Sequence, residues 1–122
     1  MYQQLGKELR KRGDDDGAHS AYEQATMIDP ADPWSHLYLG NSFYGKGAYG
    51  EALEQFQIAR RLVPDLSIAH ICIADTYQCL GQITLADEHY QRAVQLEPDD
   101  PIAQRNLARW QKIKKGLEEG CD

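Results

Sequence analysis

The chain has 122 residues, a length that suits one domain with a continuous core. Its 13 basic and 19 acidic residues give a net charge of −6, which argues against a nucleic-acid-binding protein, because such proteins present broad basic surfaces. No apolar run approaches the roughly 18 residues of a membrane helix and no secretion signal stands at the start, so we expect a soluble, cytoplasmic protein without membrane insertion.

One pattern returns every 34 residues along the chain. The recurring positions are a small residue (Gly6, Gly40, Ala74, Ala108), a central glycine (Gly13, Gly47, Gly81), an aromatic residue (Tyr22, Phe56, Tyr90) and a closing proline (Pro30, Pro64, Pro98). Glycine and proline at these places break and end helices. The pattern therefore predicts repeated units of two helices each, broken at the central glycine.

The order of small residues, aromatics and terminal proline resembles the tetratricopeptide repeat family, whose pattern is W-x2-L-G-x2-Y…A-x3-F…P. The resemblance implies an all-α fold, a right-handed α-solenoid of antiparallel helix hairpins with about seven helices. We expect a first repeat over 1–32 that lacks its usual start, a second over 33–66 and a third over 67–100. A capping helix over 101–117 and a flexible tail over 118–122 follow.

The elements follow from local signals in chain order. We expect helices through residue 12, over 17–28, from residue 33, and over 49–62, 67–79, 83–96 and 101–117. Asp32 and Asp100, each followed by proline, are predicted N-caps, whereas the cap of the 67–79 helix is Asp65 or Ser67. In the last helix Leu107 and Ala108 are expected on the core face.

Packing between the two helices of a repeat follows from the same positions. At 100° per residue, Leu39, Gly40 and Phe43 share one face of the first helix, and Phe56 lies on the facing side of the second. A small residue at position 40 lets the helices approach closely, and the aromatic ring fills the space. We expect the same arrangement in every repeat.

The opposite face of each first helix is unusually apolar for a solvated surface. The residues expected there to bind a ligand are Trp34, Leu37, Tyr38, Asn41, Tyr44, Ile68, Ile71, Cys72 and Asp75. Resemblance to the repeat family implies that this is the concave, ligand-binding wall. The alternative for Leu37, Ile68 and Ile71 is ordinary core between repeats.

Basic residues stand on the same face at both ends of the chain: Lys7, Arg10 and Lys11 in the first helix, and Arg105, Arg109 and Lys112 in the last. Arg105 and Arg109 complete the predicted ligand-binding set. An apolar trough between basic ends favours a peptide or helix with apolar anchors and acidic flanks. Plain solvation of the terminal helices is the alternative.

One subclass of the family clamps the C-terminal carboxylate of chaperone peptides with lysine, asparagine and arginine. The two alignments of that clamp fall on Leu37, Asn41, Cys72, Ile102 and Asn106, or on Gln3, Lys7, Tyr38, Ile68 and Cys72. Only Asn41 in the first alignment matches. We therefore do not expect chaperone C-termini to bind through this clamp.

No pattern indicates catalysis, a cofactor or a metal. Gly45, Gly47 and Gly50 match a dinucleotide fingerprint, but a helix rather than a strand is predicted before them. His36 and His70 are expected to pack in the interior near each other, while His19 and His89 look like surface residues. Cys72 and Cys79 are seven positions apart on one helix, about 10 Å, too far for a disulfide, so reduced thiols are expected.

The sequence thus predicts a non-catalytic protein-interaction module, a scaffold, adaptor or chaperone-like domain without cofactors. Two alternatives remain open. The apolar wall, with Trp34 or Trp110, mediates self-association as a weak homo-oligomer, or the chain is an accessory repeat domain of a larger multidomain protein.

Overall fold

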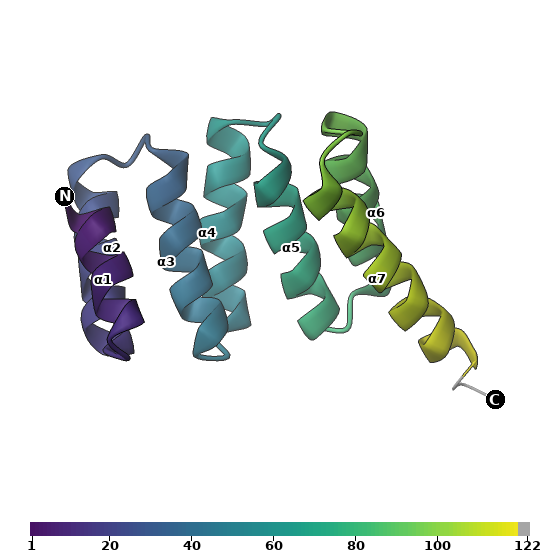
Figure 1. Ribbon diagram of the computed structural model, residues 1–122, viewed down its shortest axis with the longest axis horizontal. Helices are drawn as coiled ribbons and strands as arrows, with labels where there is room; N and C mark the ends of the chain where they lie inside the picture. The colour runs from purple at the N-terminus through teal and green to yellow at the C-terminus, as the bar shows by residue number, and fades with distance from the viewer. Residues whose placement is uncertain (120–122) are drawn as a thin grey trace. The chain divides into compact units, whose positions relative to one another are not determined.

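A computed structural model describes residues 1–119 and contains seven α-helices in that part of the chain (Figure 1). They are α1 (Tyr2–Lys11), α2 (Asp15–Ile28), α3 (Pro33–Gly45), α4 (Tyr49–Leu62), α5 (Ser67–Cys79), α6 (Ile83–Leu96) and α7 (Pro101–Glu119). The described residues contain no strand. The predicted all-α helical-repeat fold is confirmed.

Three helix boundaries differ from the sequence-based expectation. α1 ends at Lys11 rather than at residue 12. α2 begins at Asp15 rather than at Gly17, because the Asp14 carboxylate accepts a hydrogen bond of 2.9 Å from the Gly17 backbone N–H and so caps the helix two residues earlier. α7 continues to Glu119, so it extends two residues into the expected flexible tail of 118–122. The rest of that predicted tail, 120–122, lies outside the described residues.

The central glycine of each repeat forms the turn between its two helices. Gly13, Gly47 and Gly81 have φ angles of +83°, +78° and +76°, in the left-handed region that favours glycine. Gly47 therefore belongs to a turn that follows helix α3, and no strand precedes the fingerprint-like glycines. The dinucleotide motif is a coincidence of spacing.

The predicted caps of α3 and α7 are confirmed. Asp32 Oδ1 accepts from the backbone N–H of Trp34, and Asp100 Oδ1 accepts from that of Ile102, both at 3.0 Å. The expected side-chain cap of α5 is wrong: its N-cap position is Leu66, and neither Asp65 nor Ser67 makes a side-chain cap bond.

The chain divides into two compact units, residues 1–64 and 65–122. In the first unit α1 packs on α2, α3 packs on α4, and α2 also packs on α3. A Cβ atom built on Gly6 would lie 2.4 Å from the Tyr22 ring, and one on Gly40 would lie 2.5 Å from the Phe56 ring. The predicted contact between small and aromatic residues is therefore confirmed in both hairpins.

In the second unit α5, α6 and α7 enclose one cluster of buried residues. Tyr90 of α6 and Trp110 of α7 are each 1% exposed, with ring centroids 5.5 Å apart, and the Trp110 indole N–H donates to Asp87 Oδ1 at 3.1 Å. Trp110 is thus a core residue and is not available for the self-association considered above. Leu107 packs against this cluster, but Ala108 is exposed, which corrects its expected core position.

Candidate functional site

The predicted ligand-binding residues separate into accessible and buried side chains. Leu37 and Ile71 are only 2% and 5% exposed, and Ile71 belongs to the buried cluster of the second unit. Their burial favours the alternative stated for them, ordinary core, over contact with a ligand. The half-buried or exposed members are Trp34, Tyr38, Asn41 and Tyr44 in the first unit, and Ile68, Cys72, Asp75, Arg105 and Arg109 in the second.

Three aromatic residues of α3 are half-buried or exposed, namely Trp34, Tyr38 and Tyr44, and we refer to them together as the aromatic surface of the first unit. Trp34 is 44% exposed, and its ring centroid lies 6.3 Å from that of Tyr38. Tyr38 stacks on Tyr22 of α2 with centroids 5.5 Å apart. The indole is therefore held beside a fixed phenol ring while much of its surface stays open to solvent.

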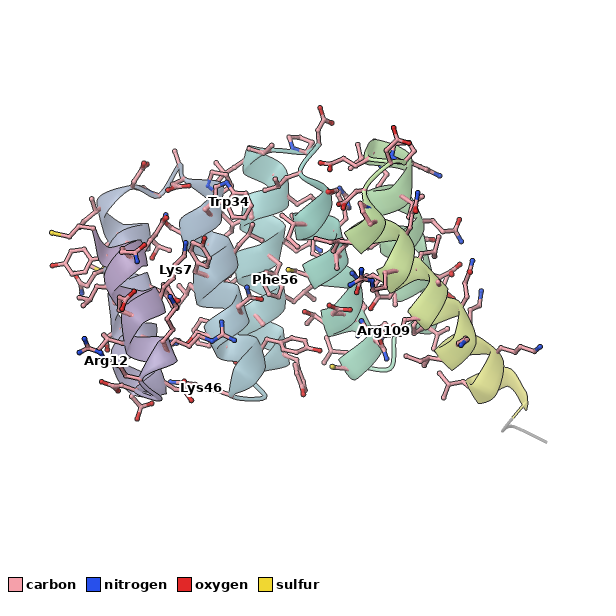
Figure 2. All side chains as sticks on the ribbon, viewed as in Figure 1. Lys7, Arg12, Trp34, Lys46, Phe56 and Arg109 are labelled. Atoms are coloured by element: carbon pink, nitrogen blue, oxygen red, sulfur yellow. The ribbon has the colours of Figure 1, made fainter. Side chains whose placement is uncertain are left out.

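Lys7 of α1 extends toward α3 beside this surface (Figure 2). Its Nζ lies 4.6 Å from the centroid of the Tyr38 ring, a cation–π contact. The hydrogen bond with the Tyr38 hydroxyl raises the pKa of Lys7 above its ordinary value of 10.5. A second link joins the same helices near their N-termini, where the Gln3 amide donates to Ser35 Oγ at 2.8 Å and to Asp32 Oδ2 at 2.7 Å.

At the other end of α3, Tyr44 makes an edge-to-face contact with Tyr49 of α4, with centroids 5.3 Å apart. One helical turn earlier, Asn41 lines a cavity together with residues of α1 and α2. The predicted first-unit residues thus lie along α3 from its first turn to its last.

In the second unit Asp75 is already engaged within the protein. Its carboxylate accepts hydrogen bonds from the Tyr90 hydroxyl and, at 3.3 Å, from the Arg109 guanidinium. Arg109 also donates to Asn106 Oδ1 at 3.1 Å. Burial raises the pKa of Asp75, and the bond from Tyr90 and the charge of Arg109 partly oppose that rise. Asp75 and Arg109 therefore hold α5, α6 and α7 together, and a ligand must share or replace these bonds.

Cys72 lies one turn before Asp75 on α5. Burial of the sulfur, with a smaller effect of the Asp75 charge, raises the pKa of the Cys72 thiol to about 12. The thiol is therefore protonated at neutral pH, which suits a small apolar contact and opposes a nucleophilic role.

The histidines differ in part from expectation. His36 is buried as predicted, with Nδ1 2.8 Å from Gln55 Oε1 and Nε2 2.8 Å from the Pro30 carbonyl oxygen. His70 is also buried, but its Nδ1 lies 3.0 Å from Nδ1 of His89 on α6. His89 therefore has a packed ring rather than the expected surface position.

His19 is likewise half-buried, with Nδ1 2.8 Å from Ser42 Oγ and its ring packed edge-on against Phe43. Its predicted surface position is wrong for the same reason as that of His89. The His19 ring, on α2, faces α3, which is the first helix of the next repeat. The His89 ring, on α6, faces α5, which is the first helix of its own repeat.

Among residues 1–119, no group of three or more histidine, cysteine or acidic side chains is arranged to hold a metal ion. No helix in the same part of the chain combines the length and apolar character required to cross a bilayer.

Two family models match the chain in its two units. A TPR repeat model covers residues 6–47, and a tetratricopeptide repeat model covers residues 69–100. Both matched segments carry the glycine turn described above. The chain belongs to the tetratricopeptide repeat family.

The curated relatives that this chain matches are longer proteins. Human protein O-mannosyl-transferase TMTC1 is 30% identical over 122 residues, which is 97% of this chain and 14% of the relative. A TPR repeat-containing protein of Methanocaldococcus jannaschii is 27% identical over 116 residues, 93% of this chain and 20% of the relative. The chain thus spans less than a quarter of each.

Solved tetratricopeptide structures share the fold at low identity. The Sgt2 TPR domain from Aspergillus fumigatus has a TM-score of 0.87 at 20% identity, over 99% of this chain and 82% of that one. The first TPR of Spaghetti (RPAP3), bound to the HSP90 peptide SRMEEVD, has a TM-score of 0.83 at 19% identity, over 93% and 90%.

Sequence reasoning missed several residues that line the cavity beside Asn41. They are Asp15, Tyr22, Ser42, Gly45 and Lys46, while Arg10 was recognised only as part of a basic end. One signal was present: Arg10 and Tyr44 are 34 residues apart and so share a repeat position on the accessible face. The turn residue Lys46 carried no such signal, because it lies after the last helical residue of α3.

Proposed function

We propose that this tetratricopeptide repeat chain is a non-catalytic protein-interaction module whose first unit binds a peptide or helix on the aromatic surface of α3. The observation that carries the proposal is Trp34, which is 44% exposed beside a Tyr38 ring fixed between Tyr22 and Lys7. A rigid aromatic side chain with open surface loses little conformational entropy on binding. The Trp34 and Tyr38 rings are therefore suited to bind an apolar side chain of a partner.

Basic side chains beside the aromatic surface favour a partner with acidic residues near its apolar anchor. Lys7 adjoins Tyr38, and Arg10 lies one turn further along α1. In the second unit the proposed contacts are Ile68, Cys72, Asp75, Arg105 and Arg109. The likeness to a TPR domain solved with an HSP90 peptide supports peptide binding as the class of function.

A peptide display library tests the proposal, with wild-type protein compared with Trp34→Ala and Met27→Ala. Met27 is 73% exposed on α2 and serves as an equally apolar control away from the aromatic surface. We expect peptides of shared sequence to bind the wild type, and Trp34→Ala to weaken their binding about thirtyfold, which corresponds to roughly 2 kcal/mol for a central aromatic anchor. Met27→Ala should bind as the wild type does.

The proposal fails if no peptide is enriched, or if both substitutions weaken binding equally. Circular dichroism on each variant separates lost binding from lost folding. Because Trp34 is 44% exposed and lies outside the buried core, its substitution should leave the helices intact.

Self-association through Trp34 is the second candidate, favoured by the same exposed indole. Sedimentation velocity over a wide concentration range separates it from peptide binding. A concentration-dependent dimer that Trp34→Ala abolishes would favour self-association, whereas a monomer throughout leaves the aromatic surface for another protein.

The length of the matched relatives favours a third candidate, in which this module serves as an accessory domain beside other domains. Human TMTC1 is named a transferase, but the chain spans only 14% of it, so that activity is not assigned to these repeats. The gene sequence around the coding region tests this candidate directly.

A further inference from the structure

A stripe of side chains runs along α1 from its N-cap to its C-cap. Its residues, at spacings of four, three and four, are Met1, Leu5, Glu8 and Arg12, which we call the outer stripe. Met1 and Leu5 are 96% and 45% exposed, and Arg12 is also exposed. Figure 2 shows Arg12 at the outer edge of α1, on the side away from α3. The outer stripe is therefore an open, partly apolar helix surface.

The same stripe returns along α3 and α7, where another helix covers it. Shifts of 34 and 102 residues give Ser35, Leu39, Ser42 and Lys46 along α3, and Ala103, Leu107, Trp110 and Lys114 along α7. α2 packs on α3, and α6 packs on α7. In both cases the second helix of one repeat covers the first helix of the next.

In the first unit α2 covers the stripe of α3 with an apolar contact and an ion pair. Leu39 packs with Ala18 and Tyr22, which lie four positions apart on α2. At the end of the stripe, Lys46 Nζ lies 3.3 Å from Asp16 Oδ1. The start of α2 therefore lies beside the end of α3, so the two helices are antiparallel.

In the second unit α6 covers the stripe of α7 in the same way. Leu107 packs against the buried cluster that contains Ala86 and Tyr90, again four positions apart. Lys114 Nζ lies 3.5 Å from Asp87 Oδ2. Both covered stripes thus contact one kind of helix surface, made of an alanine, a tyrosine and an acidic residue.

The outer stripe of α1 has the residues of a covered stripe without a covering helix. Leu5 occupies the repeat position of Leu39 but is largely open to solvent. Arg12 occupies the position of Lys46 and Lys114, yet it makes no ion pair within the part of the chain that the structure describes. An apolar contact and a carboxylate are therefore what this surface lacks.

A second copy of the chain is a poor source of that helix. An alanine and an aromatic residue four positions later occur on α2, α4 and α6, and each of these side chains is 2% exposed or less: Ala18, Tyr22, Ala52, Phe56, Ala86 and Tyr90. To reach another copy, such a pair must leave its own core, and the cavity left behind destabilises the protein. The observations therefore favour a helix from a different protein.

Glu8 distinguishes the outer stripe from the covered stripe of α3. It occupies the repeat position of Ser42, whose Oγ lies 2.8 Å from His19 Nδ1. The Glu8 carboxylate accepts from the Gln4 amide at 3.3 Å and lies 3.9 Å from Lys11 Nζ, both on its own helix and both exposed contacts. In a covering helix the residue after the alanine, at the place of His19, is therefore expected to be basic.

We propose that the outer stripe binds an amphipathic helix of a partner protein, antiparallel to α1, as α2 packs on α3. In that helix an alanine and, four positions later, a tyrosine or phenylalanine cover Leu5. An acidic residue two positions before the alanine pairs with Arg12, as Asp16 pairs with Lys46, and a basic residue after the alanine pairs with Glu8. The outer stripe is separate from the aromatic surface of α3, so this partner is additional to that of the proposed function.

A stapled peptide of residues 14–29 is the probe, because α2 carries every feature of this helix. Short isolated helices are unstable in water, so the staple joins positions 20 and 24, which are exposed on α2. Circular dichroism of the free peptide verifies that it is helical. We expect saturable binding to the full chain with a Kd of about 0.1–1 mM, typical of a small interface, and nuclear magnetic resonance shifts at Leu5.

Leu5→Ala and Leu117→Ala test the apolar contact. The two leucines have similar exposed fractions, 45% and 47%, but Leu117 lies on α7 in the other unit. We expect Leu5→Ala to weaken binding of the probe about tenfold, since the leucine is covered only in the complex. Leu117→Ala should bind as the wild type does.

Arg12→Glu and Lys11→Glu test the ion pair. Both change the net charge equally at the exposed end of α1, but only Arg12 belongs to the outer stripe. We expect Arg12→Glu to weaken binding about fivefold, because a repulsion replaces an exposed ion pair, and Lys11→Glu to have little effect. A probe with Asp16→Arg should bind the wild type weakly and Arg12→Glu normally.

Four results would overturn the inference: no binding by the helical probe, equal losses within either pair of variants, no recovery on exchange of the two charges, or loss of binding in Trp34→Ala. The last result would mean that the probe binds the aromatic surface. Sedimentation of the protein alone provides one more test. A homodimer that Leu5→Ala dissociates would show that a second copy, rather than a partner protein, covers the outer stripe.

Discussion

Asp75 is a residue whose predicted role changes once its neighbours are known. The sequence places it on the accessible face of α5, where a carboxylate suits ligand binding. In the folded protein it accepts from Tyr90, which is 1% exposed, and from Arg109. Its negative charge is partly desolvated, and desolvation outweighs these two favourable partners in raising its pKa. Asp75 therefore makes stability depend on pH.

We expect Asp75→Asn to reduce this pH dependence. Because the folded-state pKa lies above the ordinary value of 3.8, the folded protein holds the Asp75 proton more tightly than the unfolded chain does. Its contribution to stability is present below about pH 3.8 and is lost as the pH rises through the folded-state pKa. Urea unfolding from about pH 3.5 to 7 should show wild type losing stability relative to Asp75→Asn. The reverse trend would contradict the assigned cause.

At the scale of the helix hairpin, contact between a small and an aromatic residue sets how closely two helices approach. Gly40 of α3 has the Phe56 ring where a Cβ atom would lie, and Gly6 of α1 has the Tyr22 ring there. Phe56 and Tyr22 are 1% and 2% exposed, so neither ring can move without disturbing the core. This contact repeats because the sequence pattern repeats.

Gly40→Ala should therefore destabilise the protein even though alanine favours helices. A Cβ atom 2.5 Å from the Phe56 ring forces a shift that costs about 1–3 kcal/mol, more than the roughly 1 kcal/mol gained in helix propensity. Gly50→Ala, in α4, is the control, since nothing lies within 4 Å of its added Cβ. Denaturant unfolding of both variants measures the difference. An unchanged midpoint for Gly40→Ala would disprove the close approach.

At the scale of the whole molecule, local and periodic features could be predicted from the sequence, and contacts between elements often could not. Asp32 caps a helix through its own neighbours, and Gly47 turns the chain by its own backbone, so each leaves a local signal. The burial of Leu37 and Ile71 could not be predicted, because it depends on which neighbouring helices cover them. His89 needed its partner His70, nineteen positions away on the preceding helix. The cavity beside Asn41 could not be predicted either, because its lining comes from three different helices.

The two compact units each contain one tryptophan in a different environment. Trp34 in the first unit is 44% exposed, and Trp110 in the second is 1% exposed. Each indole thus reports on the unfolding of its own unit. Repeat proteins behave approximately as sums of local stabilities and nearest-neighbour terms, so a local change need not act equally on both units.

We expect Gly40→Ala to shift the Trp34 transition more than the Trp110 transition. The measurement uses fluorescence during denaturant unfolding, with Trp34 observed in a Trp110→Phe background and Trp110 in a Trp34→Phe background. Each background supplies its own reference without the glycine substitution. Equal shifts would mean that the two units unfold in a single cooperative step.

The three hairpin turns share one backbone conformation over two successive residues. Arg12, Lys46 and Leu80 end their helices at φ and ψ angles near −84° and −1°, and the glycine after each has a φ near +80°. A copy of residues 47–80 spliced in after Leu80 would join a residue in the first conformation to a glycine in the second, as at the native turns. Recombination at this point can therefore lengthen or shorten the protein by whole 34-residue repeats, and the turn at the junction keeps its native conformation.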